Sequence, residues 1–180
     1  RIEIRMKKLN SKSWSWVRVN GLARRDKQRR PVMLVGVWVN ITRRKTAELR
    51  AAEDRDLFHT LIEHIPDSIY FKNRESRFVL ANTATANKLG VPTPADLTGR
   101  TDDYFFDQTM SDISRKEEMD IMVTGRPIRA RLHHETWLHK DDSWSQISKF
   151  PWYGRNGELK GIVGISSDVT KLVKTEIKAT

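Results

Sequence analysis

One stretch of this chain occurs twice, and the repeat limits its possible folds more than any other feature. Residues 35–42 (VGVWVNIT) match residues 163–170 (VGISSDVT) at a spacing of 128. Upstream, Ser-Trp-Ser occurs at residues 13–15 and again at 143–145, a spacing of 130, so the second copy is predicted to be two residues shorter across its turn. A period of this length indicates two domains in tandem rather than a solenoid of short repeats.

Each copy predicts three antiparallel strands. In the second copy Asn156-Gly157 separates two apolar runs, and Asn-Gly is a strong signal for a tight hairpin turn because both residues tolerate positive φ. In the first copy the basic run at residues 24–30 takes the same place and is predicted to form a hairpin tip. Ile2–Leu9 and Ile128–His139 are the strand candidates that precede the two hairpins.

The positive charge is concentrated at one end of the chain. Residues 1–50 hold 15 Lys and Arg against 3 Asp and Glu, whereas residues 51–180 hold 18 against 20. Because the basic run lies at a predicted hairpin tip, where Lys and Arg are ordinary solvated surface, no nucleic acid partner is expected. The alternative, a basic segment that contacts nucleic acid, predicts salt-dependent DNA binding that is lost when Arg24, Arg25, Arg29 and Arg30 are neutralised.

Two absences narrow the function classes. The chain has no cysteine, which excludes disulfides, thiol nucleophiles and cysteine-linked chromophores. No apolar run approaches the roughly 20 residues needed to cross a bilayer, so no membrane contact is expected in these residues. A cytoplasmic location is the expectation. No phosphate-binding glycine loop and no Ser/His/Asp arrangement stands out, so these residues are not expected to form an enzyme.

The middle of the chain predicts a helix and then a mixed domain. Residues 43–65 contain no Gly or Pro and carry apolar residues at helical spacing near their end, which predicts a linker helix ended by Pro66. Residues 68–72 and 77–81 read as strands, Asn82 is positioned to cap a short helix, and residues 109–124 predict a longer helix. The order is therefore strand, strand, helices and three strands, an α+β arrangement.

This order and several short motifs resemble the PAS domain family. Residues 61–72 (LIEHIPDSIYFK) resemble the entry to the first PAS strand, residues 78–82 (FVLAN) the second strand, residues 97–102 (LTGRTD) the loop before the long helix, and residues 168–170 the Asp-x-Thr signature after the last strand. The resemblance implies a five-stranded antiparallel sheet with helices on one face, preceded by a partial upstream PAS domain of three strands. It implies the boundaries 1–42, 43–65, 66–170 and 171–180 for the upstream strands, the linker helix, the complete PAS domain and the start of an output helix.

The resemblance also implies a role in signalling. The module would bind a small ligand or relay a conformational signal to a downstream histidine kinase or diguanylate cyclase in the same chain, and would dimerise through its linker helices. Asp168 and Thr170 would transmit the signal at the last junction, with Asn40 and Thr42 as their counterparts at the first. A ligand-free PAS dimerisation scaffold is the alternative.

Six residues are candidates for a ligand pocket: Phe71, Asn82, Thr85, Phe106, His134 and Thr136. Thr85 stands where the family often has an aromatic residue, which would leave room beside Phe71 and Phe106. If the leucines of the strand at residues 132–138 face the pocket, alternation places His134 and Thr136 with them and Trp137 on the outer face. Glu117, Glu118 and Asp120 are predicted to lie on the solvated face of their helix.

No cofactor and no metal site is predicted. His133 and His134 are neighbours on a strand and point to opposite faces, so they cannot share one ion. Residues 109–124 hold no histidine, which argues against heme and leaves His64 and His134 as the remaining axial candidates. Noncovalent flavin stays open on the sequence.

Overall fold

The structure is a computed structural model that describes residues 2–7 and 13–179, and the chain divides into two compact units, Arg1–His59 and Thr60–Thr180. Within the described residues, no helix combines the length and the apolar character that a bilayer crossing requires.

The first unit is built on a three-stranded antiparallel sheet of β1 (Ile2–Lys7), β2 (Trp14–Arg25) and β3 (Pro31–Asn40), in that order. The predicted hairpin tip at residues 24–30 is confirmed: the Asp26 carboxylate accepts hydrogen bonds from the amides of Gln28 and Arg30, and Arg29 takes a left-handed φ of 64°. The predicted strand Ile2–Leu9 is confirmed as far as Lys7, and its last two residues lie outside the described part of the chain.

A helix of 23 residues, α1 (Thr42–His64), follows β3 and continues into the second unit. Its bounds agree within one residue with the predicted linker helix at 43–65. It ends at His64 because the proline at position 66 disfavours helical geometry at Ile65.

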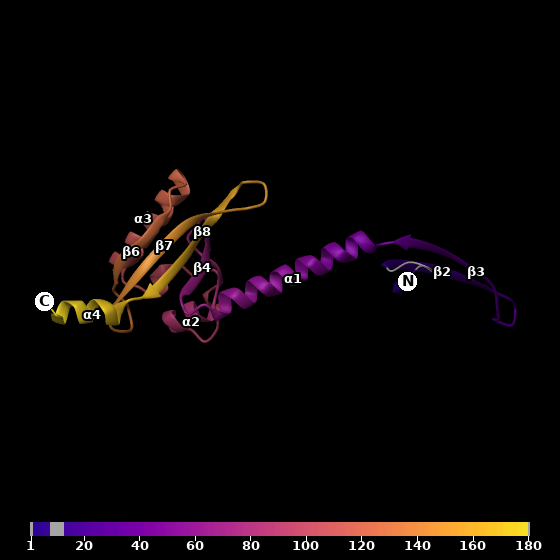
Figure 1. Cartoon of the computed structure of the whole chain (residues 1–180), viewed down its shortest axis with the longest axis horizontal. Helices are drawn as coiled ribbons and strands as arrows, with labels where there is room; N and C mark the ends of the chain where they lie inside the picture. Colours follow the sequence, from indigo (N-terminus) through magenta and orange to yellow (C-terminus); the bar gives the residue numbers. More distant parts are fainter. Residues whose placement is uncertain (1, 8–12, 180) are drawn as a thin grey trace. The chain divides into compact units, whose positions relative to one another are not determined.

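The second unit has a five-stranded antiparallel sheet in the order β5-β4-β8-β7-β6. The strands are β4 (Ser68–Asn73), β5 (Phe78–Ala81), β6 (Ile128–Glu135), β7 (Ser143–Tyr153) and β8 (Leu159–Asp168). The helices are α2 (Thr83–Leu89), the short 3₁₀ helices η1 (Pro94–Leu97) and η2 (Asp102–Tyr104), α3 (Gln108–Thr124) and α4 (Thr170–Ala179). In this unit α2 packs against β4, and α3 packs against β7 and β8 (Figure 1). The predicted α+β fold is confirmed.

The core of the second unit lies between this sheet and its helices. Its buried members include Tyr70, Phe78, Leu97, Ile121 and Ile162. The predicted cap at the start of α2 is confirmed, since the fully buried Asn82 accepts hydrogen bonds from the amides of Thr85 and Ile69.

The two hairpins, β2–β3 and β7–β8, have the same strand pairing, with equivalent residues always 128 positions apart. This corrects the predicted spacing of 130 between their Ser-Trp-Ser segments. Arg25 pairs with Pro31 across the first turn and Tyr153 pairs with Leu159 across the second, so both turns have the same length. Trp16, and not Trp14, is therefore the counterpart of Trp144. The error arose because the first copy contains two tryptophans two residues apart, which offer the same Ser-Trp pattern in two registers.

Candidate functional site

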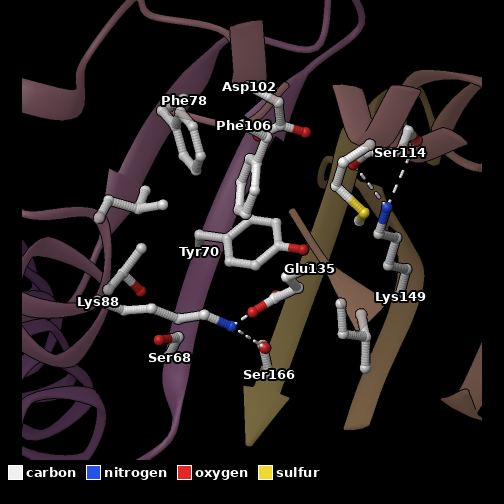
Figure 2. A pocket seen from close by; sticks show the side chains of 14 residues that line it. Ser68, Tyr70, Phe78, Lys88, Asp102, Phe106, Ser114, Glu135, Lys149 and Ser166 are labelled. Atoms are coloured by element: carbon white, nitrogen blue, oxygen red, sulfur yellow. Dashed lines mark hydrogen bonds and ion pairs between the residues drawn. The ribbon is translucent and has the colours of Figure 1, made fainter. Parts of the chain in front are cut away.

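A cavity of about 40 Å³ lies inside the second unit, between the sheet and the helical elements (Figure 2). Phe78, Phe106 and Met110 form an apolar wall, while side chains from β4, α2, β6, β7 and β8 form a polar one. The space corresponds to a few water molecules. The polar wall is unusual because it contains ionised groups that are paired inside the domain.

Lys88, on α2, joins three strands through its ammonium group. Its Nζ donates to Glu135 Oε1 at 2.8 Å and to Ser166 Oγ at 2.7 Å (Figure 2). It also donates to Ser145 Oγ at 2.8 Å. Glu135 is buried and also accepts hydrogen bonds from the hydroxyls of Ser143 and Ser145. A change at this ammonium therefore reaches β6, β7 and β8 together.

A second buried ion cluster centres on Lys72 of β4. Its Nζ lies 2.6 Å from Asp102 Oδ2 and 2.7 Å from Glu118 Oε1. Burial opposes ionisation, but the charges of Asp102 and Glu118 outweigh it and raise the pKa of Lys72. Burial likewise opposes ionisation of Asp102, but Lys72 and Lys149 lower its pKa. Lys72 and Asp102 are thus charged in the folded protein.

The third cluster links α3 to β6 and β7 through Glu117. Its carboxylate oxygens lie 3.1 Å from Lys149 Nζ, 3.0 Å from His133 Nε2 and 2.8 Å from Arg131 Nη1. Burial alone would raise the pKa of Glu117, but the hydrogen bond with His133 and the charge of Lys149 outweigh it and lower the pKa to about 2. Lys149 also donates to the hydroxyl of Ser114 at 2.9 Å.

Tyr70 points its hydroxyl into the cavity from β4 (Figure 2). Its side chain is buried, and burial followed by the charge of Glu118 raises the pKa of the phenol well above its usual value. The ring fits because Gly164 on the neighbouring strand has no side chain; a Cβ there would overlap the end of the tyrosine ring. The phenol is therefore a neutral hydrogen-bonding group inside a charged site.

A larger hollow of about 220 Å³ adjoins the cavity and shares Ser68, Lys88 and Ser166 with it. Over this hollow, the Lys140 ammonium lies 3.4 Å from the ring centroid of Trp137 and donates to the carbonyl of Lys88. Burial and then the charge of Lys88 lower the pKa of Lys140. The side chain of Lys88 thus stands between the inner cavity and the outer hollow.

The structure places two of the six predicted pocket residues, Thr85 and Phe106, in the cavity wall. Asn82 does not line the cavity. It holds the backbone of the α1–β4 connection, because its Nδ2 donates to the carbonyls of Ile62 and Asp67. Thr136 does not line the cavity either, and its carbonyl accepts a hydrogen bond from the Asp107 amide at 3.1 Å.

Phe71 and His134 do not line the cavity, because both strands present the opposite face to it. On β4, Ser68 and Tyr70 point inward, so Phe71 points outward and packs edge-to-face on Trp152. His134 lies on the outer face with its ring 4.7 Å from that of Trp144.

The face prediction for β6 failed because it assumed that apolar side chains are buried. His133 and Glu135 are buried, whereas Leu132 is 50% exposed. Trp137 likewise packs on Phe106 of the core, with ring centroids 4.3 Å apart, and does not lie on the outer face.

The ionised residues of the site are the ones that sequence reasoning missed. Glu117 and Glu118 were predicted to be solvated with Asp120, yet both are buried and only Asp120 is exposed. In α3, Ser111 and Ser114 continue the stripe of Glu118 at helical spacing and are buried with it. Because polar residues at helical spacing normally mark a solvated face, the pattern gives no hint of burial unless the cations opposite are known.

The junction after β8 is held by a three-residue arrangement called here the β8–α4 clasp. The Thr170 amide donates to the Asp168 carboxylate at 2.8 Å, and the Trp144 amide donates to the Thr170 hydroxyl at 2.9 Å. Burial opposes ionisation of Asp168, but hydrogen bonds from Thr170 and the charges of Lys88 and Lys140 lower its pKa.

The junction after β3 repeats this geometry as the β3–α1 clasp. The Thr42 amide donates to Asn40 Oδ1 at 2.9 Å, and the Trp16 amide donates to the Thr42 hydroxyl at 2.9 Å. All four residues predicted for signal transmission therefore form matching contacts, while their role in transmission stays a prediction.

The histidines considered as heme ligands lie away from the cavity, and the expectation that the domain holds no cofactor stays a prediction. His64 is exposed and bonded to the carbonyl of Thr60, and His134 faces outward, so neither heme candidate lines the cavity. In the described parts of the chain, no group of three or more His, Asp or Glu residues could hold a metal ion.

Comparison with known proteins agrees with this architecture. A family profile described as the PAS fold matches residues 62–174. The solved PAS domain of BvgS from Bordetella pertussis is similar to this chain with 23% sequence identity and a TM-score of 0.53, over 71% of this chain and 96% of that one. The chain belongs to the PAS fold family, and its second unit is a PAS sensory domain.

Two curated relatives are signalling proteins. A diguanylate cyclase from Vibrio cholerae serotype O1 is 28% identical over 132 residues, which are 71% of this chain and 40% of the relative. The methanogenesis regulatory histidine kinase FilI from Methanothrix harundinacea is 23% identical over 121 residues, which are 67% of this chain and 13% of the relative. The chain thus spans less than half the length of either relative.

Proposed function

We propose that the second unit senses a small ligand in its charged cavity and relays the change through α4 to an effector in the same chain. The two curated relatives, a diguanylate cyclase and a histidine kinase, support these two effector classes. These residues act as a cytoplasmic sensory module and not as an enzyme.

The observation that carries the proposal is the short path along β8 from the cavity to α4. Ser166 lines the cavity and accepts a hydrogen bond from Lys88 at 2.7 Å. Asp168, two residues further on, accepts the hydrogen bond that starts α4. A ligand that moves the Lys88 ammonium changes both the hydrogen bond at Ser166 and the field at Asp168, because the charge of Lys88 acts on both.

Hydrogen exchange in a serine variant tests this path. In Ser166→Ala the link from Lys88 to β8 is lost, and we expect the Val173 amide, which donates to the Val169 carbonyl at the start of α4, to exchange about fivefold faster. The matched control is Ser167→Ala, the next residue of β8, which does not line the cavity. Equal exchange rates of the Val173 amide in the two variants would rule out the proposed relay along β8.

Dimerisation through α1 is part of the proposal. Leu49, Leu57 and Leu61 are at least half exposed on this helix, and apolar side chains on one helix favour pairing with a second copy. Sedimentation of the Leu57→Glu/Leu61→Glu variant should shift toward monomer. A variant that remains dimeric would show that the interface does not include these leucines. A wild-type chain that is monomeric would exclude dimerisation through α1.

A second candidate function, the ligand-free dimerisation scaffold, is favoured by one observation. The inner cavity measures only about 40 Å³ and its charged groups are already paired with one another. A scaffold predicts that no small molecule raises the melting temperature of the chain, whereas the sensor predicts saturable stabilisation by its ligand.

A further inference from the structure

The polar groups around the inner cavity are either charged side chains that pair with one another or neutral hydroxyls, and this difference indicates the chemistry of the ligand. Its charged side chains are Lys88 and Lys149 against Asp102 and Glu135, two cations and two anions. Each of them has a partner of opposite charge: Lys88 pairs with Glu135 at 2.8 Å, and Asp102 pairs with Lys72 at 2.6 Å. The wall as a whole carries no net charge.

The cations have little capacity left for a ligand. The three hydrogens of the Lys88 ammonium are taken by Glu135, Ser145 and Ser166. Lys149 is held by Glu117 at 3.1 Å and by Ser114 at 2.9 Å. An anionic ligand would have to break an existing buried pair, which is unfavourable because it leaves a buried carboxylate without its cation.

The groups that are free to bind are neutral hydroxyls. Within residues 2–7 and 13–179, neither the Tyr70 nor the Ser68 hydroxyl has a hydrogen-bond partner, although their side chains are only 9% and 5% exposed. Both line the cavity from β4 (Figure 2). A hydroxyl that faces the cavity and is not bonded to another side chain can donate to and accept from a bound molecule, so these two groups are available to a ligand.

The wall provided by Phe78, Phe106 and Met110 is apolar. A ligand that fits between the polar and the apolar wall therefore carries hydrogen-bonding atoms on one side and carbon atoms on the other.

We propose that this cavity takes a small neutral molecule that offers a hydrogen-bond acceptor and a donor on one edge and carbon on the other, and that Tyr70 selects it. This inference rests on the proposed sensory function and adds the ligand class. A cavity of about 40 Å³ holds roughly three or four non-hydrogen atoms. A larger ligand reaches the adjoining hollow of about 220 Å³ only by moving Lys88, the residue that is linked to β8.

Three probes of similar size and different charge test the ligand class: acetamide, acetate and ethylammonium. Each is titrated into the isotopically labelled 180-residue chain at constant ionic strength, and the amide resonances of β4 and β8 report binding. We expect acetamide to bind at least tenfold more tightly than either ion. Tyr70→Phe should raise its Kd by about fivefold, while Tyr153→Phe, which removes a hydroxyl from a side chain that is 51% exposed, should leave it unchanged.

The possible outcomes separate this inference from the proposed function. Tighter binding of acetate or ethylammonium at the same resonances overturns the neutral class but keeps the cavity as a ligand site. Binding of acetamide with the same Kd in Tyr70→Phe overturns the selecting role of Tyr70. Binding of none of the three overturns the inference, and the Ser166→Ala exchange experiment still decides whether β8 relays to α4.

Discussion

The sheets of the two units share one hydrogen-bonding scheme and carry opposite chemistry. The buried positions of β6, β7 and β8 hold residues such as His133, Glu135, Ser145 and Ser166, and their counterparts in the first unit are Ile4, Met6, Val17 and Trp38. Trp38 is 60% exposed, whereas Ser166 is 3% exposed. The backbone pairing is thus independent of what the inner face carries, and among the described residues the buried ionisable side chains all lie in the second unit.

The largest expected effect is on the second unit alone. Lys72→Met leaves Asp102 and Glu118 buried without their cation, and should destabilise this unit by about 3–5 kcal/mol. Hydrogen exchange in urea, followed on peptides of each unit, should show no change in β1–β3. Lys116→Met, at an exposed position of α3, is the control and should stay within about 0.5 kcal/mol. A loss of stability below about 1 kcal/mol in Lys72→Met would mean that the buried ion cluster contributes little. The two units would then not differ in the way proposed.

A pH titration sharpens the contrast through Glu117. Its pKa is lowered from 4.5 to about 2 on folding. Because the folded pKa lies below the unfolded one, the stabilisation is complete above about pH 4.5 and is lost as the pH falls toward 2. Glu117→Gln should cost about 2–3 kcal/mol at pH 7, and the gap to wild type should close in acid.

Asp120→Asn, on the exposed face of the same helix, provides the control for Glu117→Gln and should track the wild type at every pH. A gap between wild type and Glu117→Gln that stays constant down to pH 2 would show that packing, and not ionisation, causes the loss.

Two glycines at equivalent positions should respond differently to the same substitution. A Cβ at Gly164 would overlap the Tyr70 ring, whereas a Cβ at Gly36 would lie 3.2 Å from the Asn20 carbonyl oxygen. Gly164→Ala should therefore destabilise its unit by about 2 kcal/mol and Gly36→Ala by less than about 1 kcal/mol, as measured by unit-resolved exchange. Equal losses of stability in the two variants would show that the Tyr70 ring can move aside to accommodate the added methyl group.

The smallest expected effect is one the two units share. Thr42→Ala and Thr170→Ala each remove the acceptor of a tryptophan amide at 2.9 Å, and each should cost about 1 kcal/mol. Thr→Ser at either position keeps the hydroxyl and serves as the control. Losses that differ by more than about 1 kcal/mol, read from the exchange of the Trp16 and Trp144 amides, would show that the two clasps are not equivalent.

Much of this arrangement was predictable because it depends on local patterns. The absence of Gly and Pro from residues 43–65 and the proline at position 66 predicted both ends of α1 to within one residue. Asn82 was identified as a cap because it directly precedes a predicted helix. The Asx-x-Thr clasps were identifiable because they occur twice. The repeat could not fix its own register, since the letters Ser-Trp-Ser favour Trp14 as the match of Trp144. The strand pairing and the hydrogen bond to Thr42 select Trp16 instead.

The sequence by itself determined the order of elements, which follows from local patterns, and the two junctions, which occur twice. It indicated the PAS fold through the resemblance of its motifs to that family. The tertiary structure alone decided that Lys72, Lys88 and Lys149 lie inside with Glu117, Glu118 and Glu135. A charged residue can be buried only when its partner is brought from a distant element, and Lys88 and Ser166 are 78 positions apart. A pattern of single residues therefore predicts them as surface, and only the packing of α2 and α3 on the sheet makes them the interior.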